Sequence, residues 1–417
     1  MRMFRISLIL LLALSACGAS GGKSTEPVNL RLATFNVAMG LEHEGELSKA
    51  LSQGGDPRLR QLAEILQRVR PDIILLNEFD YDPEIDAAGL LNNNYLHREE
   101  NGQKAIHYAY SFRAPVNTGL DSGLDLDGDG GLGEPEDAFG YGVFPGQYGM
   151  LVLSRFPIQA DRSRSFQYFP WSGLPGAKRP MNPDGSDYYP DEVWKQLRLS
   201  SKSHWDLVFD IKGHDLHVLA FHPTPPVFDG PEDRNGARNF DESRFWLEYL
   251  QAGPDSFIVD DVGRRGGLEP GARFVIAGDL NADPRDGDSV NDAVGQLLDY
   301  PGVDSRCQPE SNGAIEASLK QGGVNLNHQG DHAADTADFN DEYTGNLRLD
   351  YLLPSAEVTI RGCGVFWPAS NEDTHALKAS NEDTHALKVL NEEASNEDTH
   401  ELVDVSDHRL VWLDISL

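Results

Sequence analysis

The sequence predicts an α/β fold, because strand-like and helix-like patterns alternate along most of the chain. Short continuous apolar runs, typical of strands buried on both faces, stop at polar residues. Segments with apolar residues at helical spacing lie between the runs, and such an order is typical of a domain built in layers. The 417 residues could fill two domains, but large α/β units also reach this length. We expect one domain over residues 30–417.

The first strand and the first helix have readable boundaries. Residues 30–35 alternate between two faces, as a half-buried strand should. Asp56 suits a helix N-cap, and Pro57 suits the first helical position. Apolar residues recur at helical spacing over residues 59–69, and Pro71 ends that segment.

Further continuous apolar runs extend the pattern to the C-terminus. They are residues 73–76, 150–153, 216–221, 274–277, 349–353 and 410–415. A helical pattern at residues 241–250 lies between two of these runs. We expect each run to form a strand covered on both faces.

Two inserts interrupt the pattern. Residues 120–147 are rich in Asp and Gly and have no secondary-structure period. In residues 369–402, the segment from Ala369 to Lys378 repeats identically at 379–388 and partially at 394–402. The histidines of the repeats could bind metal, but a solvated acidic insertion in a surface loop accounts for them more simply.

The N-terminus predicts export. Two arginines precede an apolar run at residues 6–14, which is the order of a secretory signal. The run is too short to span a bilayer, since about 20 apolar residues are needed. Residues 14–17 resemble a bacterial lipobox, in which residues 1–16 are removed and Cys17 carries lipid. An ordinary signal peptide is the alternative.

The residues after the cysteine predict where the protein is anchored. Residues 17–29 are rich in Gly and Ser and resemble a flexible tether. Gly18 is not the Asp that retains many lipoproteins at the inner membrane. We expect a lipoprotein of the bacterial cell envelope, attached to the outer membrane and facing the periplasm or the cell surface.

The net charge limits the expected binding partners, and the predicted compartment bears on the state of the cysteines. The formal net charge of −32 opposes tight non-specific binding to nucleic acid, which depends on Lys and Arg displacing counterions. A local basic cleft stays compatible with it. Cys307 and Cys363 would sit in an oxidising compartment, where they could form a disulfide or remain two buried thiols. We expect a monomer.

Polar residues gather where the apolar runs end. They are Asn36, Asn77, Glu78, His222, the segment 278–281, Asp350 and the segment 406–408. Polar residues at strand ends are usually turn and cap formers. Here every one of them is also compatible with binding metal or phosphate, which indicates a site.

Hydrolysis of a phosphate ester needs such a set. The ester's negative charge must be neutralised, and a water must be oriented for in-line attack. Mg²⁺ prefers carboxylate and amide oxygens and keeps several waters, so few protein ligands suffice. A carboxylate outside the metal shell can take the proton of the water, and histidines can hydrogen-bond the phosphoryl oxygens.

In their order along the chain, these residues resemble the endonuclease/exonuclease/phosphatase superfamily. The matching stretches are residues 33–36, 71–78, 149–158, 278–281, 348–351 and 406–408. The resemblance implies a four-layer sandwich, in which two packed, mostly antiparallel β-sheets are flanked by helices. It covers the chain from about residue 30 to the C-terminus. Asn77 departs from the pattern, because many members have Gln at this position.

The resemblance also implies a role for each site residue. Asn36, Glu78 and Asp407 would hold Mg²⁺ or Mn²⁺. Asp279 would be the general base or orient the water, and Asn281 would contact the scissile phosphate. The implied phosphate-binding residues are His408, which Asp350 orients, and His222, which contacts phosphate or acts as an acid.

Substrate contacts are harder to predict. Residues 222–239 form a long polar loop in this interpretation. Four of its residues could meet the negative charge of a substrate, namely Arg234, Asn235, Arg238 and Asn239. A loop held by its own salt bridges is the alternative. Lys195, Arg198 and Lys202 form the other local basic patch.

The Asp/Gly-rich insert also carries the pattern of a calcium loop. Its ligands would be Asp125, Asp127, Asp129 and Glu136. Hard oxygen ligands at this spacing can surround one Ca²⁺. Outside the cytoplasm calcium is plentiful enough to occupy even sites of low affinity. The flanking residues do not predict helices, so a complete EF-hand is not expected. A disordered acidic loop is the alternative.

These observations predict a metal-dependent hydrolase of phosphate esters, with phosphodiesters as the leading class. The substrate would be a small molecule, a phospholipid headgroup or nucleic acid, and the acidic surface favours the first two. Two alternatives remain, a secreted nuclease that scavenges DNA or RNA and a catalytically silent binding protein of the same fold. The presence of Glu78, Asp279 and His408 favours an enzyme.

Overall fold

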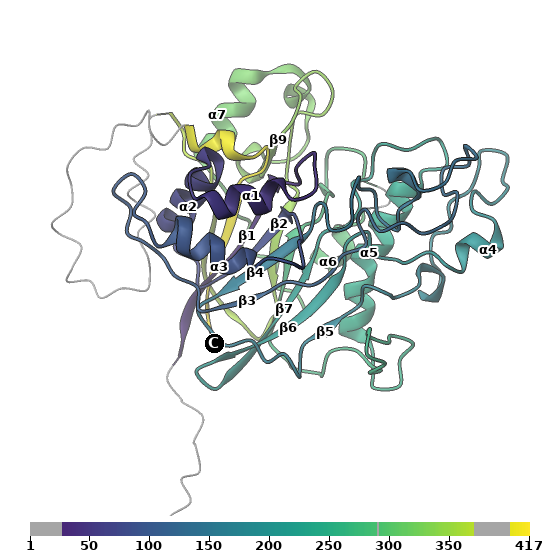
Figure 1. Cartoon of the computed structure of the whole chain (residues 1–417), viewed down its shortest axis with the longest axis horizontal. Coiled ribbons are helices and arrows are strands. Elements are labelled where there is room, and N and C mark those ends of the chain that lie inside the picture. Colours follow the sequence, from purple (N-terminus) through teal and green to yellow (C-terminus); the bar gives the residue numbers. More distant parts are fainter. Residues whose placement is uncertain (1–26, 290–291, 371–400) are drawn as a thin grey trace, which may run out of the picture.

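Two β-sheets lie face to face at the centre of the computed structural model, which describes residues 27–289, 292–370 and 401–417 (Figure 1). The strands of the first sheet are, in spatial order, β12 (Thr359–Phe366), β13 (Leu410–Ser416), β1 (Asn29–Met39), β2 (Ile73–Phe79), β4 (Met150–Ser154) and β3 (Tyr110–Phe112). Those of the second are β11 (Asp350–Pro354), β8 (Phe274–Asp279), β7 (His214–Phe221), β6 (His204–Ile211) and β5 (Arg164–Ser165). A separate hairpin joins β9 (Ala337–Asp338) to β10 (Asn346–Leu347).

Most neighbouring strands run antiparallel. The exceptions are β1 with β2 in the first sheet and β7 with β8 in the second. The helices are α1 (Glu46–Gln53), α2 (Pro57–Val69), α3 (Ala87–Leu91), α4 (Asp191–Trp194), α5 (Arg234–Gln251), α6 (Gly295–Leu298) and α7 (Asn312–Gln321).

The apolar runs are explained by what covers each face of the strands. In β2, Ile73 and Leu75 point into the core between the two sheets, whereas Ile74 and Leu76 pack against the helical layer of α1 to α3. Successive residues of a strand face opposite sides, so a strand covered on both faces is apolar throughout. The first sheet is therefore an inner layer, with helices outside it (Figure 1).

The second sheet is covered in the same way by α5. Phe245, Trp246 and Tyr249 of this helix pack on Leu219 of β7 and Ile276 of β8. With helices outside both sheets, the molecule has the four layers that the resemblance implied, and the predicted fold class is confirmed.

Most predicted elements are present. Helix α2 begins at Pro57, and the Asp56 side chain caps it by accepting a hydrogen bond from the Leu59 N–H at 3.0 Å. Cys307 and Cys363, which are 56 residues apart in sequence, form the predicted disulfide. Among the described residues, every helix is too short or too polar to span a lipid bilayer. The predicted signal segment, Cys17 and most of the repeat insert lie outside the described residues.

The predicted polar loop at residues 222–239 is wrong over its last third, because α5 begins at Arg234 rather than near residue 241. The buried face of the first turns of α5 carries the polar residues Asn239, Asp241 and Glu242, all fully buried. These side chains hydrogen-bond to neighbouring loops instead of filling an apolar core. The helical period of apolar residues is therefore missing there.

His204, the first residue of β6, lies buried beneath α5 among aromatic rings and predicts a pH dependence of stability. Its Nε2 donates to the Glu242 carbonyl oxygen at 2.9 Å, and its Nδ1 lies 3.1 Å from the Ser200 hydroxyl. Burial lowers the pKa of His204 to about 4, below the ordinary value of 6.5. Between these values the unfolded chain binds a proton that the folded protein does not.

The free energy of unfolding should therefore fall as the pH drops from 6.5 to 4, by about 3 kcal/mol from this residue. Urea unfolding at pH 7.5 and pH 4.5 measures the decline in wild type and in His204→Gln, whose side chain can still donate to Glu242. We expect a smaller decline in the variant. An equal decline in both proteins would mean that His204 does not titrate in this way.

Candidate active site

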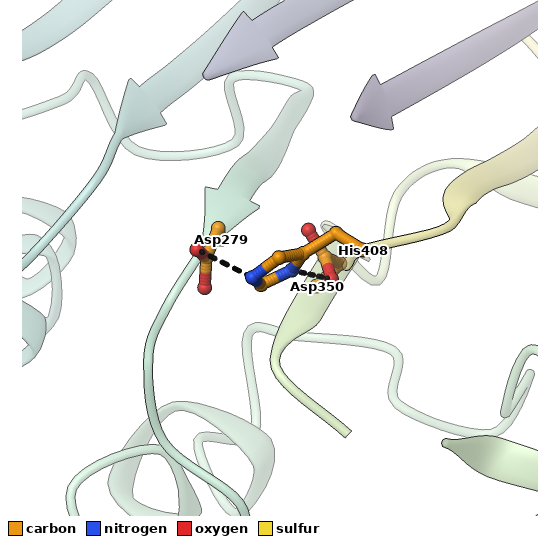
Figure 2. A group of neighbouring side chains, drawn as sticks. All are labelled: Asp279, Asp350 and His408. Carbon is orange, nitrogen blue, oxygen red and sulfur yellow. Dashed lines mark hydrogen bonds and ion pairs between the residues drawn. The ribbon is translucent and has the colours of Figure 1, made fainter. Parts of the chain in front are cut away.

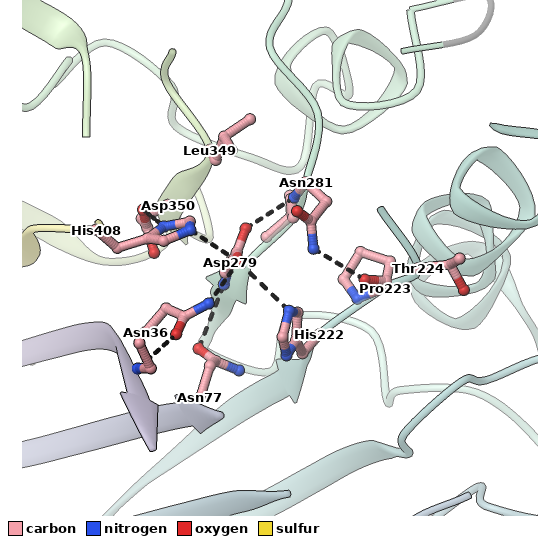
Figure 3. Close-up of polar contacts among 12 residues, drawn as sticks. Asn36, Asn77, His222, Pro223, Thr224, Asp279, Asn281, Leu349, Asp350 and His408 are labelled. Atoms are coloured by element: carbon pink, nitrogen blue, oxygen red, sulfur yellow. Dashed lines mark hydrogen bonds and ion pairs between the residues drawn. The ribbon is translucent and has the colours of Figure 1, made fainter. Parts of the chain in front are cut away.

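The topology brings the predicted site residues to one edge of the sandwich. Because β1 and β2 are parallel, as are β7 and β8, the carboxyl ends of each pair meet. Strand β11 is antiparallel to β8 and starts opposite its end, with Asp350 paired to Asp279. Strand β13 is antiparallel to β1 and starts two residues after His408. The strand ends that the sequence singled out thus lie side by side (Figure 3).

Asp279, at the end of β8, is the centre of this group. Its Oδ2 accepts a hydrogen bond from Asn36 Nδ2 at 3.0 Å. The same oxygen lies 3.3 Å from His222 Nε2 and 3.6 Å from His408 Nε2 (Figure 3). Its Oδ1 accepts from the backbone N–H of Asn281 at 2.9 Å. Four predicted site residues therefore contact one buried carboxylate.

The surroundings keep Asp279 ionised. Burial alone would raise the pKa of this carboxyl. The charge of His408 and the contacts with His222 and Asn36 outweigh burial, so the pKa of Asp279 lies well below its usual range. Asp279 is consequently a carboxylate at neutral pH, able to accept a proton or a hydrogen bond from water.

His408 and Asp350 form a second buried pair (Figure 2). His408 Nδ1 lies 2.8 Å from Asp350 Oδ2, which also accepts from the Thr336 hydroxyl at 2.8 Å. Burial would lower the pKa of His408, but the charges of Asp350 and Asp279 outweigh it and raise the pKa to about 10. The ring is therefore an imidazolium that donates from Nδ1 to Asp350 and directs its Nε2–H toward Asp279.

His222 is buried and differs from His408 in charge. Neither ring nitrogen has a hydrogen-bond partner among the described residues, and the 3.3 Å contact with Asp279 lacks hydrogen-bond geometry. Burial, followed by the charge of Lys202, lowers the pKa of His222. A neutral histidine with unused nitrogens suits a ligand, since buried polar atoms are otherwise nearly always hydrogen-bonded.

Of the predicted basic residues Lys195, Arg198 and Lys202, Lys202 lies near the predicted site carboxylates Glu78 and Asp279. It is buried, and the charges of Glu242, Glu78 and Asp279 act on it, while burial lowers its pKa. Arg198 instead donates to Asn117, and Lys195 pairs with Glu192 at the surface. Lys202 therefore places a buried amine within electrostatic range of Glu242, Glu78 and Asp279.

The predicted metal ligands lie at the same edge. Asn36 Oδ1 accepts from the Ala38 N–H at 3.0 Å. Glu78 is half-buried, and no other described residue forms a hydrogen bond or ion pair with its carboxylate. Asp407 is exposed, and its Oδ1 is 3.3 Å from the Ser406 hydroxyl, which itself donates to the Asn36 carbonyl. Carboxylate and amide oxygens of this kind fit Mg²⁺ or Mn²⁺, and the Glu78 carboxylate has no competing partner among the described residues.

The backbone around the site is held in unusual conformations. Glu78 and Asn281 have φ of 54° and 49°, in the left-handed region that residues other than glycine rarely adopt. Such strain concentrates at functional sites. A Cβ on Gly278 would lie 2.0 Å from the Phe221 carbonyl oxygen, so only glycine allows β7 and β8 to approach this closely before Asp279.

Two positioning residues were missed in the sequence, and a third, Asn77, was singled out there without a role. Asp80 accepts from the N–H groups of Leu41 and Tyr148, and burial raises the pKa of its carboxyl to about 7. Thr336, the residue before β9, donates its hydroxyl hydrogen to Asp350 Oδ2 at 2.8 Å. Asn77, where the family usually has Gln, accepts from the Asp279 N–H at 3.3 Å. Of the two missed residues, only Asp80 had a sequence signal, since it lies two positions after Glu78.

The predicted substrate-binding residues lie at the start of α5, and their side chains interact with other residues of the protein. Asn239 Nδ2 donates to the carbonyls of Thr224 and Leu280, so it ties the loop after β7 to the loop after β8. The Arg238 guanidinium donates to backbone carbonyls, including that of Phe139, and Asn235 Nδ2 donates to that of Val227.

Arg234 is half-buried and pairs with Glu232. Asn281 Nδ2 donates to the Pro223 carbonyl at 3.1 Å (Figure 3). These contacts stabilise the loops that carry His222 and Asn281. Substrate contact by the α5 residues stays a prediction.

Of the residues predicted to form a calcium loop, the three aspartates lie in carboxylate groups, whereas Glu136 does not. Asp125 and Asp127 lie close to Asp137, whereas Glu136 is exposed and outside the carboxylate cluster. The sequence pattern takes Glu136 as the last acid of the group, whereas the short 3₁₀ helix Pro135–Asp137 turns Asp137 inward and brings it into the group instead.

Comparison with known proteins agrees with the geometry. The model of the Endonuclease/Exonuclease/phosphatase family matches residues 33–408. No match is found among curated protein sequences.

Similar solved structures include three bacterial proteins. An endonuclease/exonuclease/phosphatase from Beutenbergia cavernae is 17% identical, with a TM-score of 0.47 over 93% of this chain and 72% of that one. A family protein from Leptotrichia buccalis is 14% identical, with a TM-score of 0.44 over 92% of this chain and 98% of that one. A double mutant of the Staphylococcus aureus beta toxin, with bound magnesium ions, is 13% identical, with a TM-score of 0.43 over 93% and 99%.

Proposed function

The chain belongs to the endonuclease/exonuclease/phosphatase family, and on this premise we propose that it is a metal-dependent phosphodiesterase. The observation that carries the proposal is the ionised, buried Asp279, which contacts His222, His408 and Asn36. A carboxylate held among groups that can bind phosphoryl oxygens is what activation of water beside a phosphate ester requires.

In this proposal each site residue has a distinct role. A divalent cation held by Asn36, Glu78 and Asp407 would supply positive charge against the phosphate and the leaving oxygen. Asp279 would accept a hydrogen bond from the attacking water and take its proton. His408 would donate from Nε2 to a phosphoryl oxygen, with Asp350 holding the ring. His222 and Lys202 would contact the remaining oxygens.

The acidic surface supports a small or lipid-derived ester over long nucleic acid. The formal net charge of −32 repels a polyanion, whose binding depends on many cationic contacts. Arg238 near the site already donates to protein carbonyls. We keep the location at the bacterial cell envelope as part of the proposal, supported by the sequence of residues 1–17 alone.

The first experiment is hydrolysis of a bis-aryl phosphate beside the mono-aryl ester, with Mg²⁺ or Mn²⁺ and then with EDTA. We expect cleavage of the diester that stops when the metal is chelated. Cleavage of the monoester alone would overturn the phosphodiesterase assignment in favour of a phosphatase. Activity that survives exhaustive chelation would overturn the metal-dependent mechanism.

Glu78→Gln tests the metal ligand in the same assay. The Mg²⁺ concentration for half-maximal activity should rise by more than about 10-fold, because even partners outside the ligand shell change metal affinity by 10- to 100-fold. The matched control is Glu84→Gln, an exposed residue on the loop after β2. Equal metal dependence in both variants would remove Glu78 from the site.

A further inference from the structure

Asp137, which is far in sequence from the proposed catalytic residues, has a buried carboxylate oxygen without a hydrogen-bond partner among the described residues. Asp137 is 1% exposed at the end of the 3₁₀ helix Pro135–Asp137. Its Oδ1 accepts from the Leu126 N–H at 2.8 Å, but its Oδ2 has no hydrogen-bond partner among the described residues. Leaving a buried charged oxygen unpaired is costly, so the geometry indicates a missing partner.

Two further carboxylates lie against Asp137. One ligand oxygen from each of Asp125, Asp127 and Asp137 falls within 4.8 Å of the other two. Two oxygens that bind one Ca²⁺ at about 2.4 Å are at most about 4.8 Å apart, so a single ion can reach all three. A second group, formed by Asp127, Asp129 and Glu134, shares Asp127 and extends the cluster toward solvent.

The turn that holds these carboxylates leaves them facing one another. The N–H groups of Gly128 and Gly130 donate to the two oxygens of Asp125, at 2.7 and 3.0 Å. Both glycines have positive φ, 81° and 88°. Carboxylates gathered in this way repel one another unless a cation lies between them.

We propose that Asp125, Asp127 and Asp137 bind one Ca²⁺ ion. Hard carboxylate oxygens in an irregular loop suit Ca²⁺, which takes 6–8 oxygen ligands in flexible geometry. Mg²⁺ demands a near-ideal octahedron and suits the loop less well. Asp129 and Glu134 are placed to contribute further oxygens on the solvent side.

The proposed site differs from the calcium loop that the sequence pattern predicts. That pattern ends on Glu136, which is exposed. The buried neighbour Asp137 supplies the last carboxylate instead, from a helical turn rather than from the start of an exiting helix. The two assignments of the last ligand therefore predict different losses of Ca²⁺ binding when Glu136 and Asp137 are each replaced.

The ion would fix the insert 120–147 against the rest of the protein. Leu126, between two of the ligands, is buried in the apolar cluster that includes α5. The Tyr188 hydroxyl donates to the Asp127 carbonyl at 3.2 Å, and Arg238 of α5 donates to the Phe139 carbonyl. Binding should therefore stabilise the fold without taking part in the reaction, and the proposal does not depend on the proposed function.

Terbium luminescence tests the site directly, because Tb³⁺ replaces Ca²⁺ and is excited by a nearby tyrosine. Tyr188 is in contact with the loop. Wild type, Asp137→Asn and Glu136→Gln are titrated with Tb³⁺, and Ca²⁺ is then added in competition. All three carry Glu78→Gln, so that metal at the catalytic residues contributes less signal.

We expect Ca²⁺ to displace Tb³⁺ from wild type and from Glu136→Gln, and we expect binding to Asp137→Asn to be about 10-fold weaker or more, since affinity follows the number of charged ligands. Asn retains the oxygen that accepts from Leu126, so this variant should fold. Equal binding by all three proteins, or loss only in Glu136→Gln, would overturn the assignment.

A second measurement uses melting temperature. Ca²⁺ should raise the melting temperature of wild type and Glu136→Gln but not that of Asp125→Asn or Asp137→Asn. The same rise in every protein would place the stabilising ion elsewhere and overturn the proposal.

Discussion

Replacing Asp279 by Asn should lower kcat for phosphodiester hydrolysis by about 100- to 10,000-fold, the range that a positioned general base contributes. The Asn side chain has nearly the same shape and still offers one oxygen to Asn36 or Asn281. It cannot take a proton from water, and it no longer attracts the His408 imidazolium at 3.6 Å. The loss should therefore appear in kcat more than in KM.

The matched control is Asp288→Asn, the same change at an exposed position on the loop after β8. Steady-state kinetics with saturating Mg²⁺ give kcat, and thermal unfolding gives the melting temperature of each variant. We expect the control to keep wild-type activity and Asp279→Asn to melt within a few degrees of wild type. Near-normal kcat in folded Asp279→Asn would rule out its role as the base.

The clustering of the candidate site residues could be predicted from sequence because two signals coincide at the strand ends. Continuous apolar runs such as residues 73–76 mark strands buried on both faces, and polar residues such as Glu78 mark their ends. Parallel pairing of β1 with β2 and of β7 with β8 then brings those ends together. The resemblance supplied the one step that local patterns lack, the layering of the two sheets.

Residues that support the site by hydrogen bonding were not predictable in this way. Glu242 accepts from the backbone N–H groups of Ser201 and Thr224, so it holds the loop after β7 from inside α5. Its position within a helix resembles any polar helical residue, and its partners are 41 and 18 residues away. Thr336 likewise reaches Asp350 across a turn whose path local sequence does not specify.

The proposed calcium loop shows that sequence prediction can also fail by a single residue. Spacing predicts which acids lie near one another, and Asp125 and Asp127 do. Whether the last ligand is residue 136 or residue 137 depends on the direction of one 3₁₀ turn. Asp137 in that turn accepts from the Leu126 N–H, 11 residues earlier in the chain, and a linear pattern does not encode this contact.

His408→Gln should lower kcat by about 100- to 1,000-fold, the loss typical of removing one donor to a developing negative charge. Gln can offer a neutral N–H but no positive charge. Circular dichroism should show an intact fold, because the adjacent backbone contacts are made by Ser406 and Arg409 rather than by the ring. A change of less than 10-fold would show that His408 does not contact the reacting phosphate.

Asp350→Asn tests whether Asp350 acts through His408. The carboxylate accepts from His408 Nδ1 at 2.8 Å and raises the pKa of the ring, so its removal should lower that pKa. The imidazolium would then lose its proton at lower pH, and the alkaline limb of the kcat/KM profile should move toward neutral pH in this variant. A purely structural role would lower activity at every pH without moving the limb. In that case the ion pair would orient His408 without setting its charge.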